Sequence, residues 1–375
     1  MKKLLSVLLA FFMVFALVGC SNNEDDNNGG TTGTEDGYKV AVVTDVGQLN
    51  DGGFNQGTYE GAVAFAEKNG LSYKYYQPAN GSDATDDDRI AAMRQAVEGG
   101  AEIVVTPGFL QAAALETVAK ENPEVKFVFV DGWNLGLANV TAISYHEEES
   151  GFFAGYAAVM DGYTKLGGTF GGAGTNAACN RFAYGYVQGM QAAAAELDTT
   201  VEATISFLYG GSFSASTELQ TQISGWYTNG TEVVFACGGS MLQSVKAAAA
   251  ETENGKIIGV DTDQSAESDR VITSAFKNLS GSVDLTLTKW FEGKWDGELA
   301  DKLSNLGVGD EATGLPTAEG SWRFNSFTVD QYHEVFAKVA DGSIKIDSDC
   351  ADLSTAAAWD GLKANCPNVT LTLEY

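Results

Sequence analysis

The sequence predicts an α/β protein made of two similar lobes, each a mostly parallel β-sheet flanked by helices. Short apolar stretches alternate with segments of helical spacing along most of the chain, and this alternation is typical of repeated β-α units. The pattern starts again near residue 144, and it contains more strands than one open sheet comfortably holds. Two lobes therefore explain the sequence better than one large domain.

In the first half, the helix after the opening strand has one apolar stripe, formed by Tyr59, Val63 and Ala66. The expected strands of this half are 39–44, 71–76, 103–106, 126–130 and 140–144, and the expected helices are 55–68, 86–97 and 112–121. The second half is expected to contain helices at 148–160, 181–196, 217–227, 241–251 and 283–291, and strands at 165–170, 203–208, 233–237, 256–260 and 271–275.

The first 37 residues predict an exported, lipid-anchored protein. Lys2 and Lys3 precede an apolar run at 4–18, which is too short for a membrane span and is typical of a signal peptide. Leu17-Val18-Gly19 leads to Cys20, as in a lipoprotein signal, so we expect residues 1–19 to be removed and Cys20 to carry the lipid. The alternative is an ordinary signal peptide with a chance cysteine. The polar segment 20–37 is expected to be a flexible tether on the extracytoplasmic face of the cell membrane.

Composition excludes some partners. The formal net charge of -28 predicts a surface that repels nucleic acid, so we expect no nucleic-acid partner. With only two histidines and no Cys-x-x-Cys pair, we expect neither a metal site nor a cofactor. Cys350 and Cys366 lie close in sequence, and we favour a disulfide there, with free thiols as the open alternative. Cys179 and Cys237 lie on different units, so we expect two separate buried thiols, with a bridge between them as the alternative.

Polar residues gather where the expected strands end. Asp45, Asp131 and Asp261 each come directly or almost directly after a strand, and Gly238 follows the strand at 233–237. Ligands of open α/β sheets bind beyond the carboxyl ends of the strands. If two lobes face each other across these ends, the four positions line one cleft.

Several motifs resemble the basic membrane protein family of lipoproteins, which are nucleoside-binding components of ATP-driven importers. The segment Val43–Gly57, with Asp45 and Phe54-Asn55, closely resembles the opening signature of that family. The segments Phe182–Tyr186, Tyr209–Phe213, Ile258–Gln264 and Thr273–Lys277 resemble later motifs, in the expected order. The resemblance covers about residues 38–291.

The resemblance implies a two-lobed type I periplasmic-binding fold with three crossovers between the lobes. We therefore expect a first lobe of residues 38–143 and 268–300 and a second lobe of residues 144–267 and 301–375. It also implies a monomer that works with the permease of an ABC transporter.

The resemblance also implies roles for individual residues. Asp45 corresponds to the carboxylate that grips the base, and Phe54 to one wall of a stacking slot. Phe213 is our choice for the opposite wall, although the family usually places an aspartate in the segment that here is Phe213-Ser214-Ala215-Ser216. Asp131, Asp261 and Lys277 match positions near the ribose.

The residues themselves support similar roles and leave others open. Asn55 begins a helix whose free N–H groups are expected to face the cleft. Gly238 is expected to face the cleft as well. Asp261 and Lys277 could hold two neighbouring hydroxyls, or form an ion pair that never touches ligand. Asp45 could cap a helix, Phe54 could pack on one, and Asp131 could be a turn residue.

We therefore expect a nucleoside-binding protein, with a purine as the favoured base, although the residues alone do not separate purine from pyrimidine. Aromatic walls on both sides favour a base over a sugar. The alternatives are a receptor for a sugar or a sugar-like signal, and an enzyme that cleaves nucleosides. Enzyme signatures are incomplete: the glycine-rich segment at 167–174 lacks the Lys-Ser/Thr of a phosphate loop, and Gly238-Gly239-Ser240 is not a complete nucleophile elbow. We expect no enzymatic activity.

Overall fold

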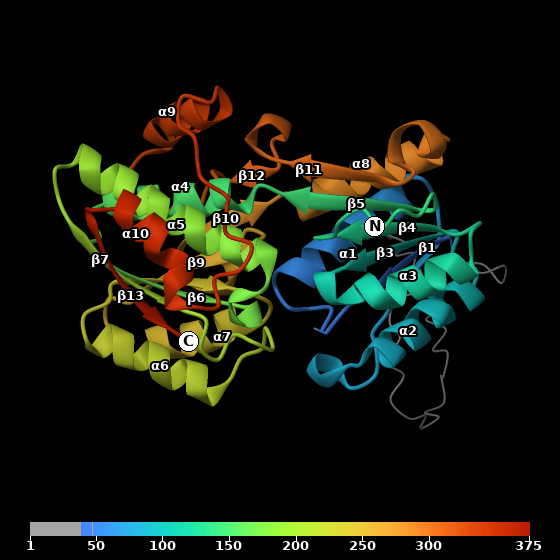
Figure 1. Cartoon of the computed structure of the whole chain (residues 1–375), viewed down its shortest axis with the longest axis horizontal. Coiled ribbons are helices and arrows are strands. Elements are labelled where there is room, and N and C mark those ends of the chain that lie inside the picture. The colour runs from blue at the N-terminus through green and yellow to red at the C-terminus, as the bar shows by residue number, and fades with distance from the viewer. Residues whose placement is uncertain (1–38, 47) are drawn as a thin grey trace, which may run out of the picture.

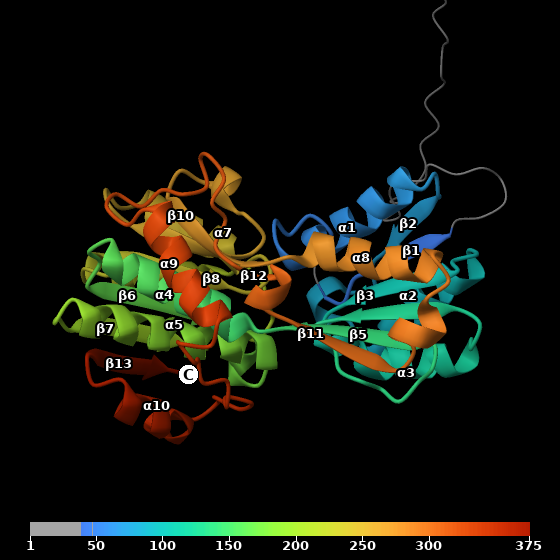
Figure 2. The ribbon, with the colours of Figure 1, turned by 90° about the horizontal axis from the view of Figure 1, so that it is seen from above.

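The computed structural model describes residues 39–46 and 48–375, which form two α/β lobes lying side by side (Figures 1 and 2). The expected signal peptide, the tether and the lipid-bearing Cys20 lie outside the described residues. Within the described part of the chain, no helix is long and apolar enough to cross a membrane. Each lobe has its own sheet with helices on both faces, which confirms the two-lobed α/β architecture expected from the sequence.

The first lobe is built on a six-stranded sheet in which every neighbouring pair of strands is parallel. In sheet order, the strands are β11 (Lys302–Leu306), β5 (Val140–Tyr145), β4 (Lys126–Val130), β3 (Ile103–Pro107), β1 (Val40–Val43) and β2 (Tyr73–Tyr76). On one face lie α1 (Phe54–Lys68) and α8 (Leu279–Phe291), and on the other lie α2 (Asp86–Glu98) and α3 (Ala112–Glu121).

The second lobe has a seven-stranded sheet that is parallel except where β12 pairs with β10. In sheet order, the strands are β12 (Thr313–Gly314), β10 (Val271–Lys277), β9 (Lys256–Asp261), β8 (Val233–Cys237), β6 (Lys165–Phe170), β7 (Val201–Ser206) and β13 (Val369–Glu374). On one face lie α4 (Glu147–Met160), α5 (Ala177–Glu196), α9 (Val329–Ala340) and α10 (Asp360–Asn365), and on the other lie α6 (Thr217–Thr228) and α7 (Met241–Ala250). Short helical turns occupy Gly81–Asp83, Phe109–Gln111, Gly172–Gly174, Ser265–Glu267, Trp295–Leu299, Val308–Asp310 and Ala356–Trp359.

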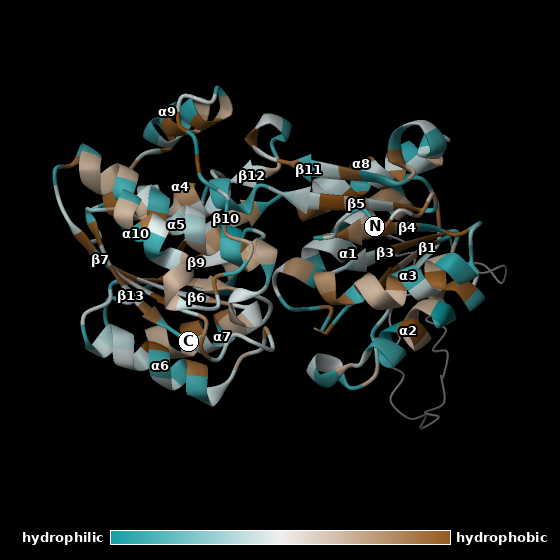
Figure 3. Ribbon diagram, viewed as in Figure 1, coloured by the Kyte–Doolittle hydropathy of each residue, from teal (hydrophilic) through white to brown (hydrophobic). Residues whose placement is uncertain are grey.

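The strands are apolar on both faces because helices cover both sides of each sheet. Val104, Val128 and Phe129 of the first sheet are fully buried. Figure 3 shows this pattern as brown strands between helices whose colours alternate between brown and teal. This near-continuous hydrophobicity is what made the strands visible in the sequence.

Helices α4 and α5 approach each other unusually closely, and glycines make this approach possible. A side-chain carbon at Gly185 would lie 2.0 Å from the carbonyl oxygen of Glu148, and one at Gly155 would lie 2.1 Å from that of Tyr186. Any larger residue would push the helices apart. The contact brings the first turn of α4 next to Arg181 of α5, beside the site described below.

The chain crosses between the lobes after β5, after β10 and after β11, as the three-crossover expectation required (Figure 2). The expected lobe boundaries differ from the strand pairing. Strand β10 pairs with β9 in the second lobe, so residues 271–277 do not belong to the first. Strand β11 pairs with β5 in the first lobe, so residues 302–306 do not belong to the second. In both cases the chain first adds a strand to one sheet and only then crosses to the other lobe. Hydrophobic periodicity does not show which sheet a strand joins.

Most elements agree with the sequence expectations to within a few residues, and 112–121, 126–130, 165–170 and 233–237 agree fully. Helix α5 begins at Ala177 rather than 181, because the Asn176 side chain caps it by accepting a hydrogen bond from the Cys179 N–H at 2.8 Å. The chain after 291 supplies the edge strand β11 to the first sheet and both edge strands, β12 and β13, to the second, and it covers the second lobe with α9.

The expectation of a disulfide between Cys350 and Cys366 is wrong, since both are buried free thiols in the structure. Both lie near Tyr184 without being joined, because nearness in sequence does not by itself bring two side chains together. Cys179 and Cys237 are free and buried, as predicted. No disulfide joins them, although the two thiols lie next to each other.

Candidate ligand-binding site

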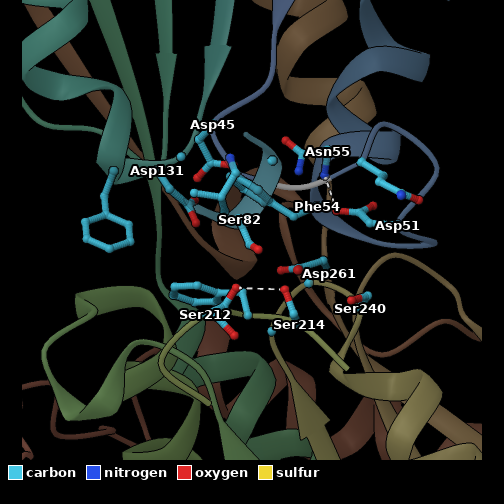
Figure 4. A pocket seen from close by; sticks show the side chains of 18 of the residues that line it. Asp45, Asp51, Phe54, Asn55, Ser82, Asp131, Ser212, Ser214, Ser240 and Asp261 are labelled. Carbon is cyan, nitrogen blue, oxygen red and sulfur yellow. Dashed lines mark hydrogen bonds between the residues drawn. The ribbon is translucent and has the colours of Figure 1, made fainter. Parts of the chain in front are cut away.

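A cavity of about 730 Å³ lies between the two lobes at the carboxyl ends of their strands. Figure 4 shows Asp45, Asp131 and Phe54 on one side of it and Ser212, Ser214 and Ser240 on the other. The structure brings all eight sequence-predicted site residues to this one cavity. They are Asp45, Phe54, Asn55 and Asp131 from the first lobe, and Phe213, Gly238, Asp261 and Lys277 from the second.

Lys277, the last residue of β10, is the centre of a buried charge cluster. Its Nζ lies 2.7 Å from Asp131 Oδ2 of the first lobe and 3.3 Å from Asp261 Oδ1 of the second. Only 2% of the lysine side chain is exposed. Burial alone would lower the pKa of Lys277, but Asp131, Asp261 and Glu147 outweigh it and raise that pKa well above its usual value. The lysine is therefore a permanent cation that joins carboxylates from both lobes.

The two aspartates of this cluster have unusual backbone conformations and unsatisfied bonding capacity. Asp131 has φ 55° and Asp261 has φ 66°, in the left-handed region that few side chains adopt. Asp131 Oδ1 is buried with no hydrogen-bond partner. Burial raises the pKa of Asp131 to about 6, against the opposing effect of Lys277. Strained backbone and an unpaired buried acceptor are both expected where a ligand completes the bonding.

Glu147 and Arg181 support the cluster from behind, and the sequence interpretation missed both. The fully buried Glu147 lies 3.5 Å from Lys277 Nζ through Oε1 and accepts a hydrogen bond of 2.5 Å from Arg181 Nε through Oε2. Arg181 also lies 3.8 Å from Glu148. The run of glutamates directly after β5 was the available signal, but only the close packing of α4 on α5 shows that Glu147 faces Lys277.

Asp45 and Asn55 form a second polar group, in the first lobe. Asp45 Oδ1 accepts a hydrogen bond of 2.7 Å from the Val46 N–H, and the Asn55 side chain also bonds to this carboxylate. Burial raises the pKa of Asp45, against the opposing effects of Val46 and Arg89. Gly108 permits this placement, since a side-chain carbon there would lie 2.0 Å from Asp45 Oδ2. Asn55 Oδ1 is buried without a partner.

The N–H groups at the start of α1 are not free for a ligand, contrary to our expectation. Asp51 accepts hydrogen bonds from the backbone N–H groups of Gly53, Asn55 and Gln56, at 2.9, 3.0 and 3.2 Å. Asp51 is buried, and burial raises the pKa of its carboxyl group. One carboxylate thus caps the helix, and any part that Asn55 plays must come from its side chain.

Aromatic rings from both lobes face the cavity. Phe54 is half-buried, and Lys277 Nζ lies 4.9 Å from its ring centroid. Phe213 of the second lobe, with φ 57°, makes an edge contact with Phe109 of the first lobe at a centroid distance of 6.1 Å. Phe109 was not expected from the sequence. Trp133, two residues after Asp131, is 47% exposed and packs against Phe129.

Direct contacts hold the lobes together on one side of the cavity. The Gly52 carbonyl oxygen of the first lobe accepts hydrogen bonds from Gln264 Nε2 at 2.8 Å and from Thr262 Oγ1 at 3.1 Å in the second. Together with the Lys277–Asp131 ion pair and the contact of Phe109 with Phe213, these bonds link the two lobes. Among the described residues, no group of three or more His, Cys, Asp and Glu is arranged to hold a metal ion.

Solved structures of low sequence identity share this fold. An ABC transporter solute-binding protein from Aeropyrum pernix K1 superposes with a TM-score of 0.72 at 22% identity, covering 88% of this chain and 97% of that one. A second, from Conexibacter woesei DSM 14684, gives a TM-score of 0.60 at 20% identity, covering 83% of this chain and 99% of that one. These similarities support the periplasmic-binding fold expected from the sequence.

Curated relatives extend over nearly the full length. The chain is 29% identical over 331 residues to the ABC transporter nucleoside-binding protein BmpA of Lactococcus lactis subsp. cremoris, covering 82% of this chain and 90% of that protein. It is 26% identical over 363 residues to the CD4+ T-cell-stimulating antigen of Listeria innocua, covering 91% of this chain and 96% of that protein. Residues 38–338 match the sequence family Bmp, described as ABC transporter substrate-binding protein PnrA-like, and the chain therefore belongs to this family of substrate-binding proteins.

Proposed function

We propose that this protein is a lipid-anchored, extracytoplasmic receptor that binds a nucleoside between its two lobes and delivers it to the permease of an ABC importer. The observation that carries the proposal is the cluster of Lys277, Asp131 and Asp261 beside the Phe54 ring. A nucleoside joins a flat base to a sugar rich in hydroxyl groups. The cavity offers aromatic rings for the first part and charged acceptors and a donor for the second.

A purine fits the polar group at Asp45 and Asn55. Both residues present acceptor oxygens, and Asn55 Oδ1 has no protein partner. A guanine edge carries a ring N–H next to an amino group, which are two adjacent donors. The similarity to the L. lactis protein named as nucleoside-binding supports the same ligand class.

Binding is tested by isothermal titration calorimetry with guanosine, inosine, adenosine, uridine, free guanine and ribose. Purine nucleosides should bind more tightly than uridine and much more tightly than guanine or ribose alone, because only the whole nucleoside engages both polar groups. Equal affinity for ribose and guanosine would instead indicate a sugar receptor, because the Lys277 cluster could bind a sugar without a base. Chromatography of guanosine after incubation tests the remaining alternative, since release of guanine would indicate a cleaving enzyme.

Delivery and anchoring need separate tests. Radiolabelled guanosine uptake by cells should fall when the protein is deleted and return when it is restored. Restoration by a variant that no longer binds guanosine in the calorimeter would contradict a role in delivery. The lipid anchor is tested through Cys20, as described in the Discussion.

A further inference from the structure

We propose that Cys179 and Cys237 form a site of reversible oxidation, at which a disulfide bond closes within the wall of the ligand cavity. The inference does not depend on the identity of the ligand. Its relevance in the cell depends on the proposed extracytoplasmic location, because disulfides form and persist outside the cytoplasm.

The fold holds the two thiols against each other. Cys237 ends β8 and Cys179 lies in the first turn of α5, with 1% and 7% of their surfaces exposed. Phe182, one turn after Cys179, packs on Phe235, two residues before Cys237, with ring centroids 5.9 Å apart. The two cysteines therefore lie next to each other, and both line the cavity. Both backbones are fixed as well: the Cys237 carbonyl oxygen accepts a hydrogen bond of 2.8 Å from the Gly171 N–H, and the Cys179 N–H donates to Asn176.

The surroundings of the two cysteines favour a reactive thiol pair over a metal site. Within the described ranges, no third side chain joins the two cysteines in a metal-binding group. Burial is the largest cause, and the neighbouring Cys179 the next, of a pKa of the Cys237 thiol that lies well above its usual value. Cys179 is the more exposed of the two, so it is the thiol that an oxidant from solution reaches first.

The reaction is a thiol–disulfide exchange with a disulfide-bearing oxidant such as oxidised glutathione. The thiolate of Cys179 attacks one sulfur of the oxidant, which forms a mixed disulfide and releases the first reduced thiol. The sulfur of Cys237 gives up its proton and attacks Cys179, which releases the second. Two protein thiols and one oxidant disulfide thus become one protein disulfide and two small thiols.

The bond would join two parts of the cavity wall. On the α5 side, Phe182 lies one turn after Cys179, with its ring centroid 5.6 Å from Lys277 Nζ. On the β8 side, the Ser240 N–H donates a hydrogen bond of 3.0 Å to the carbonyl oxygen of Phe213. Oxidation would therefore fix the Phe182 helix relative to the Phe213 loop.

The test is peptide mapping by mass spectrometry of the folded, full-length protein after treatment with oxidised glutathione and after treatment with dithiothreitol. Free thiols are alkylated before digestion without reductant. We expect a peptide pair linked through Cys179 and Cys237 in the oxidised sample, about 2 Da lighter than the two reduced peptides together. The linked pair should disappear after dithiothreitol. Oxidation should also raise Tm, by on the order of 5–10 °C for a crosslink over a long loop.

Two variants serve as matched controls. Cys179→Ser should abolish both the linked pair and the redox-dependent shift in Tm. Cys366→Ser should retain both, because Cys366 is also a buried free thiol but is not one of the proposed pair. Alkylation of both Cys179 and Cys237 in the oxidised wild type would overturn the proposal. A linkage to Cys350 or Cys366, or a glutathione adduct on Cys179 that never closes, would overturn it as well.

Discussion

Replacing Asp131 by asparagine is expected to change how the stability of the protein depends on pH. Burial raises the pKa of this carboxyl group from 3.8 to about 6 in the folded protein, whereas in the unfolded chain the group returns to its ordinary value. Between roughly pH 4 and pH 6, the folded state therefore binds more protons than the unfolded state. The contribution of Asp131 to the free energy of unfolding is thus greatest below this window and decreases as the pH rises through it.

The size of this effect follows from the pKa difference. A difference of roughly two pKa units corresponds to about 3 kcal/mol between pH 4 and pH 7. Asparagine carries no charge at any pH and cannot show this loss. The stability of Asp131→Asn relative to wild type should therefore rise by about 3 kcal/mol over the same interval. The other buried carboxyl groups are present in both proteins, so most of their contribution cancels in the difference.

The measurement is urea unfolding followed by tryptophan fluorescence at pH 4, 5, 6 and 7. Asp198→Asn is a matched control, because Asp198 has φ 51°, close to the 55° of Asp131, but is exposed. The control reports the effect of the same substitution at an exposed position of similar backbone conformation. A stability difference between Asp131→Asn and wild type that is constant with pH would refute the reasoning. A difference that changes in the opposite direction would mean that attraction to Lys277 outweighs the cost of burial.

Four further changes test the site and the anchor. Phe54→Ala should weaken guanosine binding by about 1–3 kcal/mol through lost stacking; unchanged affinity by calorimetry would remove Phe54 from the base slot. Asp261→Asn, which tolerates the φ of 66°, should weaken guanosine more than free guanine, by about 1–3 kcal/mol, and equal losses would place Asp261 away from the sugar. Thr262→Val deletes the hydroxyl that is bonded to the Gly52 carbonyl, and it should favour an open arrangement of the lobes by about 0.5–1.5 kcal/mol. Small-angle scattering without ligand should then show a larger radius of gyration. An unchanged radius would show that this bond does not hold the lobes together. Cys20→Ala should release the protein from membranes without changing guanosine affinity, and retention after a carbonate wash would contradict the lipid anchor.

Local sequence determined the elements and much of the site. Strands such as 126–130 and 165–170 are continuous apolar runs, because a strand covered by helices on both faces must be apolar on both. The positions of Asp45 and Asp261 could also be predicted, since parallel strands bring all their carboxyl ends to one edge and ligands bind beyond that edge. These properties depend on a few consecutive residues, so the sequence carries them directly.

Only the tertiary structure decided which distant segments meet. Periodicity identifies β10 as a strand, but the hydrogen bonds that assign it to the second sheet come from β9 and β12. Glu147 lies in a run of acidic residues that suggests a solvated helix start, and it faces Lys277 only because glycines let α4 pack closely on α5. The cysteines show the same limit: Cys350 and Cys366 are near in sequence and unjoined, while Cys179 and Cys237 are distant in sequence and in contact. Pairings of this kind are set by how whole elements pack, and no local pattern records them.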